Sequence, residues 1–238
     1  MKNTNKMSKQ NNENLIINQS DLKNELIILQ PGVTLSDEFK ESIKKMNAGN
    51  PSFEEYSKRV REVFLLDPVR IDEKSCYFLG GFIEGEGSFS VSVKRNDNLR
   101  FGIELDPLFN ITQHINGVRT LYLALEMFKT GRIRYKTGSN ATLVFIIEPR
   151  KSLQEKVCPF LERYVYPFSA PAKQARFRNF KLMLDLFDEN AHLDKDRFIN
   201  ELLPIWDEMR MHRSYERQTF KNLEEAQDFV INFTGNKL

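Results

Sequence analysis

Polar and apolar side chains alternate in several stretches between residues 88 and 147. In the first stretch, phenylalanine or valine stands between polar residues, which are Ser88, Ser90, Ser92 and Lys94. A period of two residues is typical of a β-strand with one buried face and one exposed face. Similar alternation, bounded by turn residues, predicts four further strands, at residues 99–105, 108–113, 131–136 and 141–147.

Apolar residues recur at intervals of three and four on either side of these strands, which predicts amphipathic helices. Ser36, Ser52 and Asp72 each begin such a segment, as residues that cap a helix N-terminus do. Between the strands, a helix is predicted over residues 118–129, with Gly131 as its C-cap. Four more are predicted after the last strand: residues 152–164, residues 172–187, residues 198–209 and a final helix capped by Asn222.

The predicted order is helix, strands, helix, strands and then helices. This order favours the α+β class with a mostly antiparallel sheet. We divide the chain into an N-terminal part, residues 1–72, with a disordered polar tail and a helical extension, a core, residues 73–190, and a C-terminal helical extension, residues 191–238. The first residues are rich in Asn and Lys and have no apolar run, so they do not resemble a secretory signal.

Composition narrows the classes of function only partly. The chain has 238 residues, of which 40% are apolar, so it can bury a substantial core. Its 35 basic and 33 acidic residues give a net charge of +2, which neither demands nor excludes a nucleic-acid partner. Cys76 and Cys158 have no metal-ligand spacing, and we interpret them as buried thiols in a reducing compartment. No apolar run approaches the roughly 20 residues that cross a bilayer.

The polar face of the predicted sheet carries Ser, Asn, Thr, Arg and Lys. Such side chains suit contacts with DNA, because Arg and Lys bind guanine or phosphate, Asn binds adenine, and Ser and Thr bind either base. Glu104 on this face could accept a hydrogen bond from cytosine or be a surface acid. An ordinary solvated face of an antiparallel sheet explains the same pattern, so the residues alone leave both interpretations open.

The junction of the third predicted helix with the first strand combines glycines with acids. Gly80 and Gly81 each cost about 1 kcal/mol relative to alanine inside a helix, which is tolerable where two backbones approach closely. Glu84 and Glu86 then stand at the helix C-terminus, where the helix dipole disfavours a carboxylate. Glu86 is therefore a candidate ligand for a hard divalent metal, together with a neighbouring carbonyl. A surface acid is the alternative.

Residues 79–87, LGGFIEGEG, resemble the LAGLIDADG motif of homing endonucleases and related intron maturases. The order of elements over roughly residues 73–187 is similar to the αββαββα core of that family, with its saddle-shaped antiparallel sheet. The stretch DPLFNITQHINGVRTLYLALEMFKTGRIRYKTGSNATL resembles a narrower group, the homodimeric enzymes encoded by group I introns in large-subunit ribosomal RNA genes of algal chloroplasts. The expected fold is thus the LAGLIDADG fold with N- and C-terminal helical extensions.

The resemblance implies roles for individual residues. Glu86 would bind the metal together with the carbonyl of Gly85, while Glu84 would brace the motif helix. Both acids are Glu where the family more often has Asp, which lengthens each acidic side chain, so the resemblance does not define the metal geometry. Gln113 would organise water, and Lys173 would complete the catalytic pocket, although a solvated helix lysine is the alternative for Lys173.

The resemblance also implies partners. Only one copy of the motif is present, so the active form would be a homodimer in which Gly80 and Gly81 let two motif helices pack. Its partner would be double-stranded DNA with a long pseudo-palindromic target. The DNA-reading positions coincide with the polar face, and they are Ser90, Ser92, Lys94, Asn96, Asn110, Arg132, Arg134, Lys136 and Thr142.

The implied reaction is a staggered double-strand break in an intronless large-subunit ribosomal RNA gene, by metal-dependent phosphodiester hydrolysis. Mg²⁺ is the expected cofactor, with Mn²⁺ as an alternative. The expected location is a chloroplast or another organelle, with a bacterial cytoplasm as the alternative. Two other functions stay open, a maturase that binds intron RNA and a non-catalytic DNA-binding regulator on the same fold.

Overall fold

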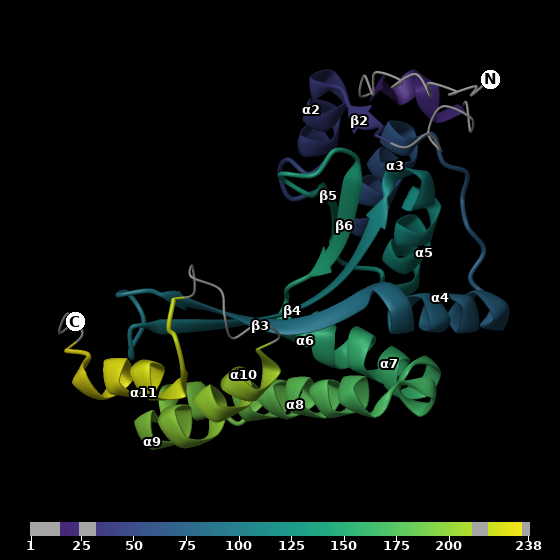
Figure 1. The fold of residues 1–238 in the computed structure, drawn as a ribbon. Coiled ribbons are helices and arrows are strands. Elements are labelled where there is room, and N and C mark those ends of the chain that lie inside the picture. The colour runs from purple at the N-terminus through teal and green to yellow at the C-terminus, as the bar shows by residue number, and fades with distance from the viewer. Residues whose placement is uncertain (1–14, 24–31, 211–218, 235–238) are drawn as a thin grey trace, which may run out of the picture.

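The computed structural model describes residues 15–23, 32–210 and 219–234. The polar tail predicted at the N-terminus falls mainly on residues 1–14, which lie outside the described residues. The described residues form helices around one four-stranded antiparallel sheet, which confirms the α+β class (Figure 1). No helix in these ranges has both the length and the apolar character that a membrane span requires.

The sheet has the order β3-β4-β6-β5, and each neighbouring pair is antiparallel. The strands are β3 (Gly87–Arg95), β4 (Ile103–His114), β5 (Arg132–Tyr135) and β6 (Thr142–Ile147). In Figure 1, β3 and β4 extend as a long ribbon from which β5 and β6 rise steeply, so the sheet is strongly bent. Two further short strands, β1 (Ile16–Ile17) and β2 (Thr34–Leu35), form a separate parallel pair.

The prediction of two strands at residues 99–105 and 108–113 was wrong. A single strand, β4, runs through Asp106 and Pro107, and residues 99–102 belong to the turn before it. Pro107 pairs with Val91 of β3, whereas β6 pairs with β4 only from Phe109 onward. Proline lacks the N–H that a central strand must donate, so it is tolerated where one side of the strand has no partner.

Helices cover the apolar face of the sheet, as the alternation predicts. The rings of Phe177 and Phe180 on α8 (Pro171–Asp188) each lie 5.8 Å from the ring of Phe89 on β3. The ring of Phe128, at the end of α5 (Val118–Phe128), lies 5.8 Å from that of Phe109 on β4. Each such buried side chain contributes about 1.5–3 kcal/mol, so these aromatic contacts fix α5 and α8 on the sheet.

The other helices precede or follow the sheet. Before it come η1 (Gln19–Lys23), α2 (Asp37–Met46), α3 (Phe53–Phe64) and α4 (Glu73–Glu86), and η2 (Ile115–Gly117) precedes α5. After it come α6 (Arg150–Ser152), η3 (Leu153–Val157), α7 (Cys158–Tyr164) and η4 (Tyr166–Phe168). The C-terminal group is η5 (Ala191–Leu193), α9 (Lys195–Arg197), η6 (Phe198–Leu202), α10 (Leu203–Met209) and α11 (Leu223–Asn232).

Four predicted helix starts are confirmed, whereas the helix predicted from residue 152 begins at Arg150, and one predicted helix end is wrong. The predicted N-caps accept a hydrogen bond from the main chain of the first turn, and they are Ser36, Ser52, Asp72 and Asn222. Helix α5, however, ends with Lys129 in the left-handed conformation, and the Lys129 N–H donates to Leu125. Gly131 lies beyond this cap, where a Cβ atom would meet the ring of Phe145 at 2.7 Å. It is needed for close packing on β6 rather than for the cap.

The two extensions flank opposite ends of the sheet. The N-terminal helices α2 and α3 lie beside β5, and α10 and α11 lie near the tip of the β3–β4 hairpin (Figure 1). One hydrophobic core runs from Ile17 to Val230 through all three of the predicted parts. The extensions therefore pack onto the core sheet and do not form separate cores, and the residue boundaries of the three parts stay a prediction.

Candidate active site

The acidic site lies where α4 ends and β3 begins. Asp72 and Ser75 cap the N-terminus of α4 reciprocally, each side chain accepting from the main chain of the other. At the other end, the N–H of Gly87 donates to the carbonyl of Ile83, and the chain enters β3 without a loop. The acids at this junction are thus held between a regular helix and a paired strand.

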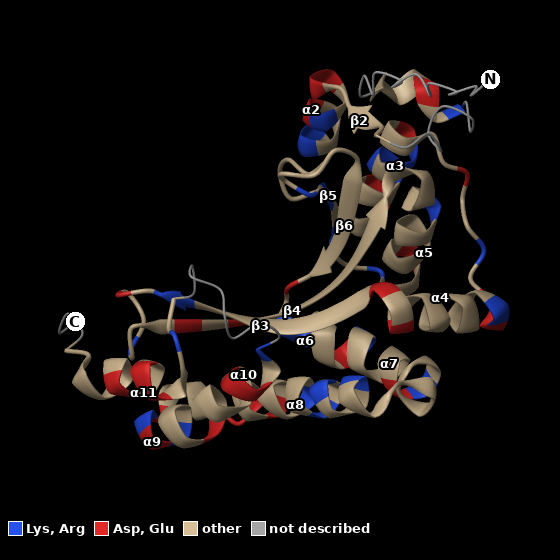
Figure 2. Ribbon diagram, in the orientation of Figure 1, with Lys and Arg blue, Asp and Glu red and all other residues tan. Residues whose placement is uncertain are grey.

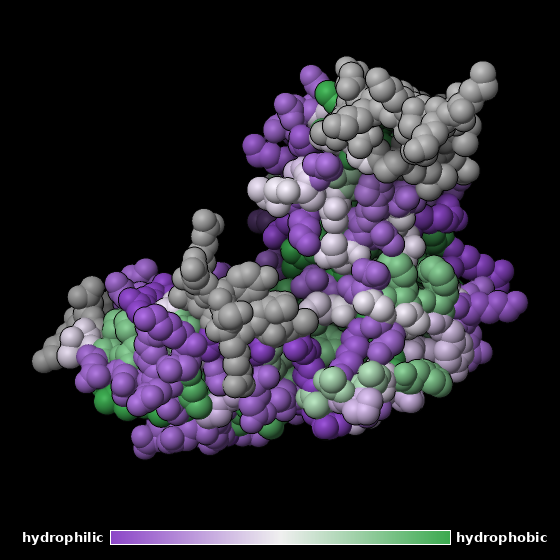
Figure 3. Space-filling view, viewed as in Figure 1, coloured by the Kyte–Doolittle hydropathy of each residue, from purple (hydrophilic) through white to green (hydrophobic). Residues whose placement is uncertain are grey.

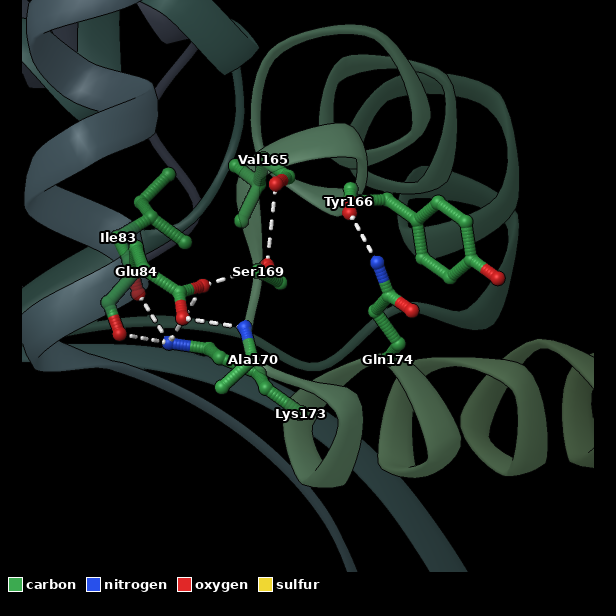
Figure 4. A network of polar contacts seen from close by, with 8 residues as sticks. All are labelled: Ile83, Glu84, Val165, Tyr166, Ser169, Ala170, Lys173 and Gln174. Atoms are coloured by element: carbon green, nitrogen blue, oxygen red, sulfur yellow. Dashed lines mark hydrogen bonds and ion pairs between the residues drawn. The ribbon is translucent and has the colours of Figure 1, made fainter.

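Glu84 joins the end of α4 to the start of α8 (Figure 4). Its carboxylate accepts hydrogen bonds from the Ser169 hydroxyl and from the main-chain N–H of Ala170, the latter at 3.2 Å. Ala170 is the N-cap of α8 and has no side-chain oxygen of its own for this purpose. A carboxylate is stabilised at a helix N-terminus by the free N–H groups and the dipole there. Glu84 therefore caps a second helix.

Lys173 completes the same junction. Its Nζ donates to the main-chain carbonyls of Ile83, at 2.5 Å, and of Glu84, and lies 3.8 Å from the Glu84 carboxylate. Only 17% of the side chain is exposed, and this burial lowers the pKa of Lys173, whereas the charge of Glu84 opposes the shift. A cation at the C-terminal carbonyls of a helix is favourable. Lys173 is thus not a solvated lysine, since it caps α4.

Glu86 is the acid that these contacts leave free. Within the described residues, its exposed carboxylate makes no hydrogen bond or ion pair, and Gly85 beside it has open space where a Cβ would lie. Carboxylate and carbonyl oxygens are the ligands that Mg²⁺ and Ca²⁺ prefer. No group of three or more His, Cys, Asp or Glu residues within the described ranges could hold a metal. Glu86 and Gly85 therefore fit a hard cation that takes its remaining ligands from outside the protomer.

Gln113 lies close to this junction but on the other side of its strand. Gly87 pairs with Ile111, so Gln113 lies beyond the start of β3 and next to the last turn of α4. By alternation it shares the helix-covered face with Ile111. Its side-chain oxygen accepts from the His114 N–H at 2.7 Å, and its carbon atoms contact Gly117. No contact joins Gln113 to Glu86 among the described residues, and its catalytic role stays a prediction.

The polar face continues from Glu86 across the whole sheet. The register aligns Ser88 with Asn110, Asn110 with Ile146, and Ile146 with Arg132, so these four residues form a row across the strands. All four are partly exposed. The predicted DNA-reading positions on the strands lie on this face, and they are Ser90, Ser92, Lys94, Asn110, Arg132, Arg134 and Thr142. Asn96 and Lys136 lie just beyond the strand ends.

Several charged groups of this face are paired with one another. The Nζ of Lys94 lies 2.8 Å from the Asp106 carboxylate, and this hydrogen bond raises the pKa of Lys94. Asn96 donates to Glu104 at 3.1 Å, and Arg134 lies 3.3 Å from Glu148. Figure 2 shows acids among the basic residues along β3 and β4. Exposed pairs of this kind contribute little to stability, so they restrain these side chains only weakly.

Several residues of the site were not predicted from the sequence. Ser169 and Ala170 bind Glu84 from 85 and 86 residues away. The polar face also contains Leu108, Val144 and Ile146, which are partly exposed and apolar. Ser169, in the SAP segment before α8, could have been recognised as a residue near a helix start. The apolar positions break the alternation rule and could not have been assigned to DNA contact.

The two motif glycines of α4 face different neighbours. A Cβ on Gly80 would meet the main-chain oxygen of Tyr164 at 2.4 Å, so this close approach is to α7 of the same chain. A Cβ on Gly81 would meet nothing within 4 Å. The prediction that both glycines serve a dimer contact is therefore corrected for Gly80, which packs within the protomer. Gly81 remains available to a partner.

Exposed aromatic side chains lie on α4 one turn before Gly81. Tyr77 and Phe78, on the same helix, are 51% and 56% exposed, and Phe168, just before α8, is 69% exposed. Figure 3 shows apolar and neutral residues on the side of the molecule where α4 and α7 lie. Large aromatic side chains that cluster in an exposed position mark an interaction surface.

Helix α4, which contains Gly80 and Gly81, thus ends at the unpaired acid Glu86, and the sheet with the polar face begins directly after it with β3. The chain belongs to the LAGLIDADG endonuclease family, whose family model matches residues 79–184.

The similarity to individual proteins covers more of the chain than residues 79–184. The chain is 49% identical to the DNA endonuclease I-CeuI of Chlamydomonas moewusii over 209 residues, which are 87% of this chain and 96% of that protein. The solved structure of the group I intron-encoded homing endonuclease I-CeuI in complex with DNA matches with a TM-score of 0.81 and 48% identity, covering 85% of this chain and 99% of that one. The crystal structure of the homing endonuclease I-TnaI matches with a TM-score of 0.54 and 27% identity, over 68% and 98% of the two chains.

Proposed function

We propose that this protein is a site-specific homing endonuclease that makes a staggered double-strand break in an intronless large-subunit ribosomal RNA gene. The observation that carries the proposal is the free carboxylate of Glu86, which lies at the start of a polar sheet face and is flanked by a capped helix end. The likeness to I-CeuI, which has been solved in complex with DNA, supports it across nearly the full length of that protein. An RNA-binding maturase or a DNA-binding regulator would not need this acid.

The active form is a homodimer. One protomer supplies one free acid at the end of α4, while cutting two strands requires two sites. Gly81 and the exposed Tyr77 and Phe78 form an apolar helix surface that a second copy can cover. Two-fold symmetry then gives a long pseudo-palindromic DNA target.

Glu86 and the carbonyl of Gly85 would hold the divalent metal, which would be Mg²⁺ or, alternatively, Mn²⁺. Such a metal would supply Lewis-acid chemistry at the scissile phosphate. The residues of the chain position the reaction. Lys173 and Glu84 fix the last turn of α4, so the Glu86 carboxylate has a defined place. Gln113 orders water near the junction.

The polar face binds the DNA. An antiparallel ribbon such as β3–β4 fits the major groove, which is wide enough for two strands. Arg and Lys side chains on the face and at the strand ends contact phosphates and guanines, and the serines and Asn110 contact other bases. Expression in a chloroplast or another organelle is part of this proposal, in accordance with the algal origin of the I-CeuI relative.

The test is a cleavage assay on duplex DNA. The purified full-length protein is incubated with a plasmid that carries intronless large-subunit ribosomal DNA, with Mg²⁺, with Mn²⁺ and with a chelator, and the product ends are sequenced. We expect one staggered cut that requires the metal, and a dimer by light scattering. Binding of this DNA without any cut under all metal conditions would contradict the proposal and favour a regulator. Tight binding of intron RNA alone would favour a maturase.

A further inference from the structure

The N-terminal extension covers the free edge of the sheet through one tyrosine. Tyr56, on α3, is fully buried, and its hydroxyl accepts a hydrogen bond from the Ile133 N–H of β5 at 2.8 Å. The same hydroxyl donates to the Asn47 side chain at 3.1 Å, and the Asn47 amide donates to the Ile133 carbonyl at 2.9 Å. These contacts satisfy the outward main-chain groups of an edge strand, which would otherwise be open.

The ring of Tyr56 also holds the neighbouring arginine of β5. The guanidinium of Arg132 lies over this ring, 4.2 Å from its centroid. A cation–π contact uses the flat face of a guanidinium and leaves the N–H donors in its plane free. No described residue accepts a hydrogen bond from Arg132, whereas Arg134, two residues further on the same face, donates to Glu148.

Arg132 occupies the end of the row that also contains Ser88 and Asn110. This row starts two residues after Glu86, so Arg132 lies on the same face of the sheet as the strand that leads from the acid. A guanidinium whose plane is held in one orientation and whose N–H groups are unpaired can donate two hydrogen bonds to guanine, one to O6 and one to N7. The same pair of donors can also bind a phosphate through two parallel hydrogen bonds, and only a guanine contact makes selectivity depend on one base pair.

We propose that Tyr56 is a positioning residue for DNA specificity, since it holds the guanidinium of Arg132 in the orientation that reads one guanine in each half-site. The inference rests on the proposed function, because it requires a bound DNA duplex. It assigns the N-terminal extension a part in DNA recognition without any direct contact between α3 and DNA.

The test compares cleavage of the target with a set of duplexes that carry every single base-pair substitution. Four variants are measured beside the wild type. Arg132→Lys keeps the charge but loses the fork, and Tyr56→Leu loses the ring. Tyr56→Phe keeps the ring but loses the hydroxyl, and Arg119→Lys is the control, at an exposed arginine of α5 that is not part of the polar sheet face. The salt dependence of binding is recorded for each.

We expect Arg132→Lys and Tyr56→Leu to lose roughly 5- to 100-fold selectivity at the same base pair of each half-site. Tyr56→Phe should retain this selectivity although it unfolds at a lower temperature, and Arg119→Lys should leave the selectivity unchanged. If Tyr56→Leu does not fold, Arg132→Lys and Tyr56→Phe still decide the question.

Three results would overturn the inference. One is unchanged selectivity in Arg132→Lys. Another is an equal loss of selectivity in Tyr56→Phe, because the ring would then not be what holds Arg132. The third is an equal loss of affinity for every duplex in Arg132→Lys, with no base pair affected more than the others, which would identify a phosphate contact. Failure of the wild type to cut any duplex is a different outcome, since it contradicts the proposed function itself.

Discussion

The ammonium group of Lys173 donates to the main-chain carbonyl of Ile83 at 2.5 Å, and so fastens the first turn of α8 to the last turn of α4. Glu84 makes the reverse connection, from α4 to the main chain of α8. Each helix therefore caps the other with a charge of the appropriate sign. These two contacts fix the last turn of α4, and they thereby fix the position of Glu86, which ends this turn.

Replacing Lys173 by methionine should destabilise the protein by about 1–3 kcal/mol, because two partly buried carbonyls lose their donor and the Glu84 carboxylate loses its ion pair. Lys181→Met is the matched control, since Lys181 is on the same helix and pairs with Glu162 in solvent. The control should cost at most about 1 kcal/mol. Urea denaturation of both variants measures the difference. Equal stability of the two variants would show that the capping of α4 by Lys173 contributes nothing.

The two glycines of α4 should respond in opposite ways to alanine. Gly80→Ala places a methyl group against the oxygen of Tyr164 and should destabilise the protomer by about 1–3 kcal/mol. Gly81→Ala meets no atom of its own protomer and favours the helix by up to about 1 kcal/mol. The same methyl group lies on the surface proposed for the second copy, so it should weaken the dimer.

Denaturation and sedimentation of these two variants separate the effects. Denaturation at one low protein concentration compares the folding of the protomers, and sedimentation over a range of concentrations measures dissociation of the dimer. A Gly81→Ala variant with undiminished dimer affinity would remove α4 from the proposed interface.

Sequence patterns predicted the elements of this fold well and their tertiary contacts poorly. Capping residues such as Ser52 and Asn222 act locally, so they could be assigned from adjacent residues. Pro107 was misread because its tolerance in β4 depends on where β6 ends, which is a non-local fact. The contact between Arg132 and Tyr56 joins residues that no periodicity relates. The alternation could place Arg132 on the polar face, but it could not reveal what holds its side chain.

Alkaline pH should destabilise the protein through Cys158. Burial raises the pKa of this thiol from 9.0 to about 12, so the folded state keeps its proton while the unfolded state loses it. The stabilisation from this group is complete below pH 9 and is lost as pH rises toward 12. Between pH 9 and 10 the free energy of unfolding should fall by about 1 kcal/mol because of this thiol.

The control for this prediction is Cys158→Ala, whose unfolding free energy should change less over the same pH unit. The range stops at pH 10 because Tyr56, whose pKa burial raises from 10.0 to about 12, adds a fall of the same sign above it. Chemical denaturation at several pH values measures both proteins. Parallel pH profiles for the wild type and the variant would contradict the assignment.

The C-terminal extension should hold the tip of the β3–β4 hairpin through Arg95. Its guanidinium lies 5.1 Å from the ring centroid of Phe220 and 5.0 Å from that of Phe229. Arg95→Met should weaken this contact by roughly 1–2 kcal/mol and increase hydrogen exchange over residues 96–102. The exposed Arg119 on α5 provides the control substitution to Met. An unchanged exchange pattern in Arg95→Met would show that the hairpin tip does not depend on α11.

The measurement that tests the central claim most directly compares Glu86→Gln with the wild type for both cutting and binding of the same DNA duplex in Mg²⁺. Glu104→Gln is the matched control, because it removes an acid from the same sheet face, away from the end of α4. We predict that Glu86→Gln binds the target with nearly wild-type affinity but cuts it at least about 100-fold more slowly, while Glu104→Gln still cuts. Cutting by Glu86→Gln at the wild-type rate would contradict the account.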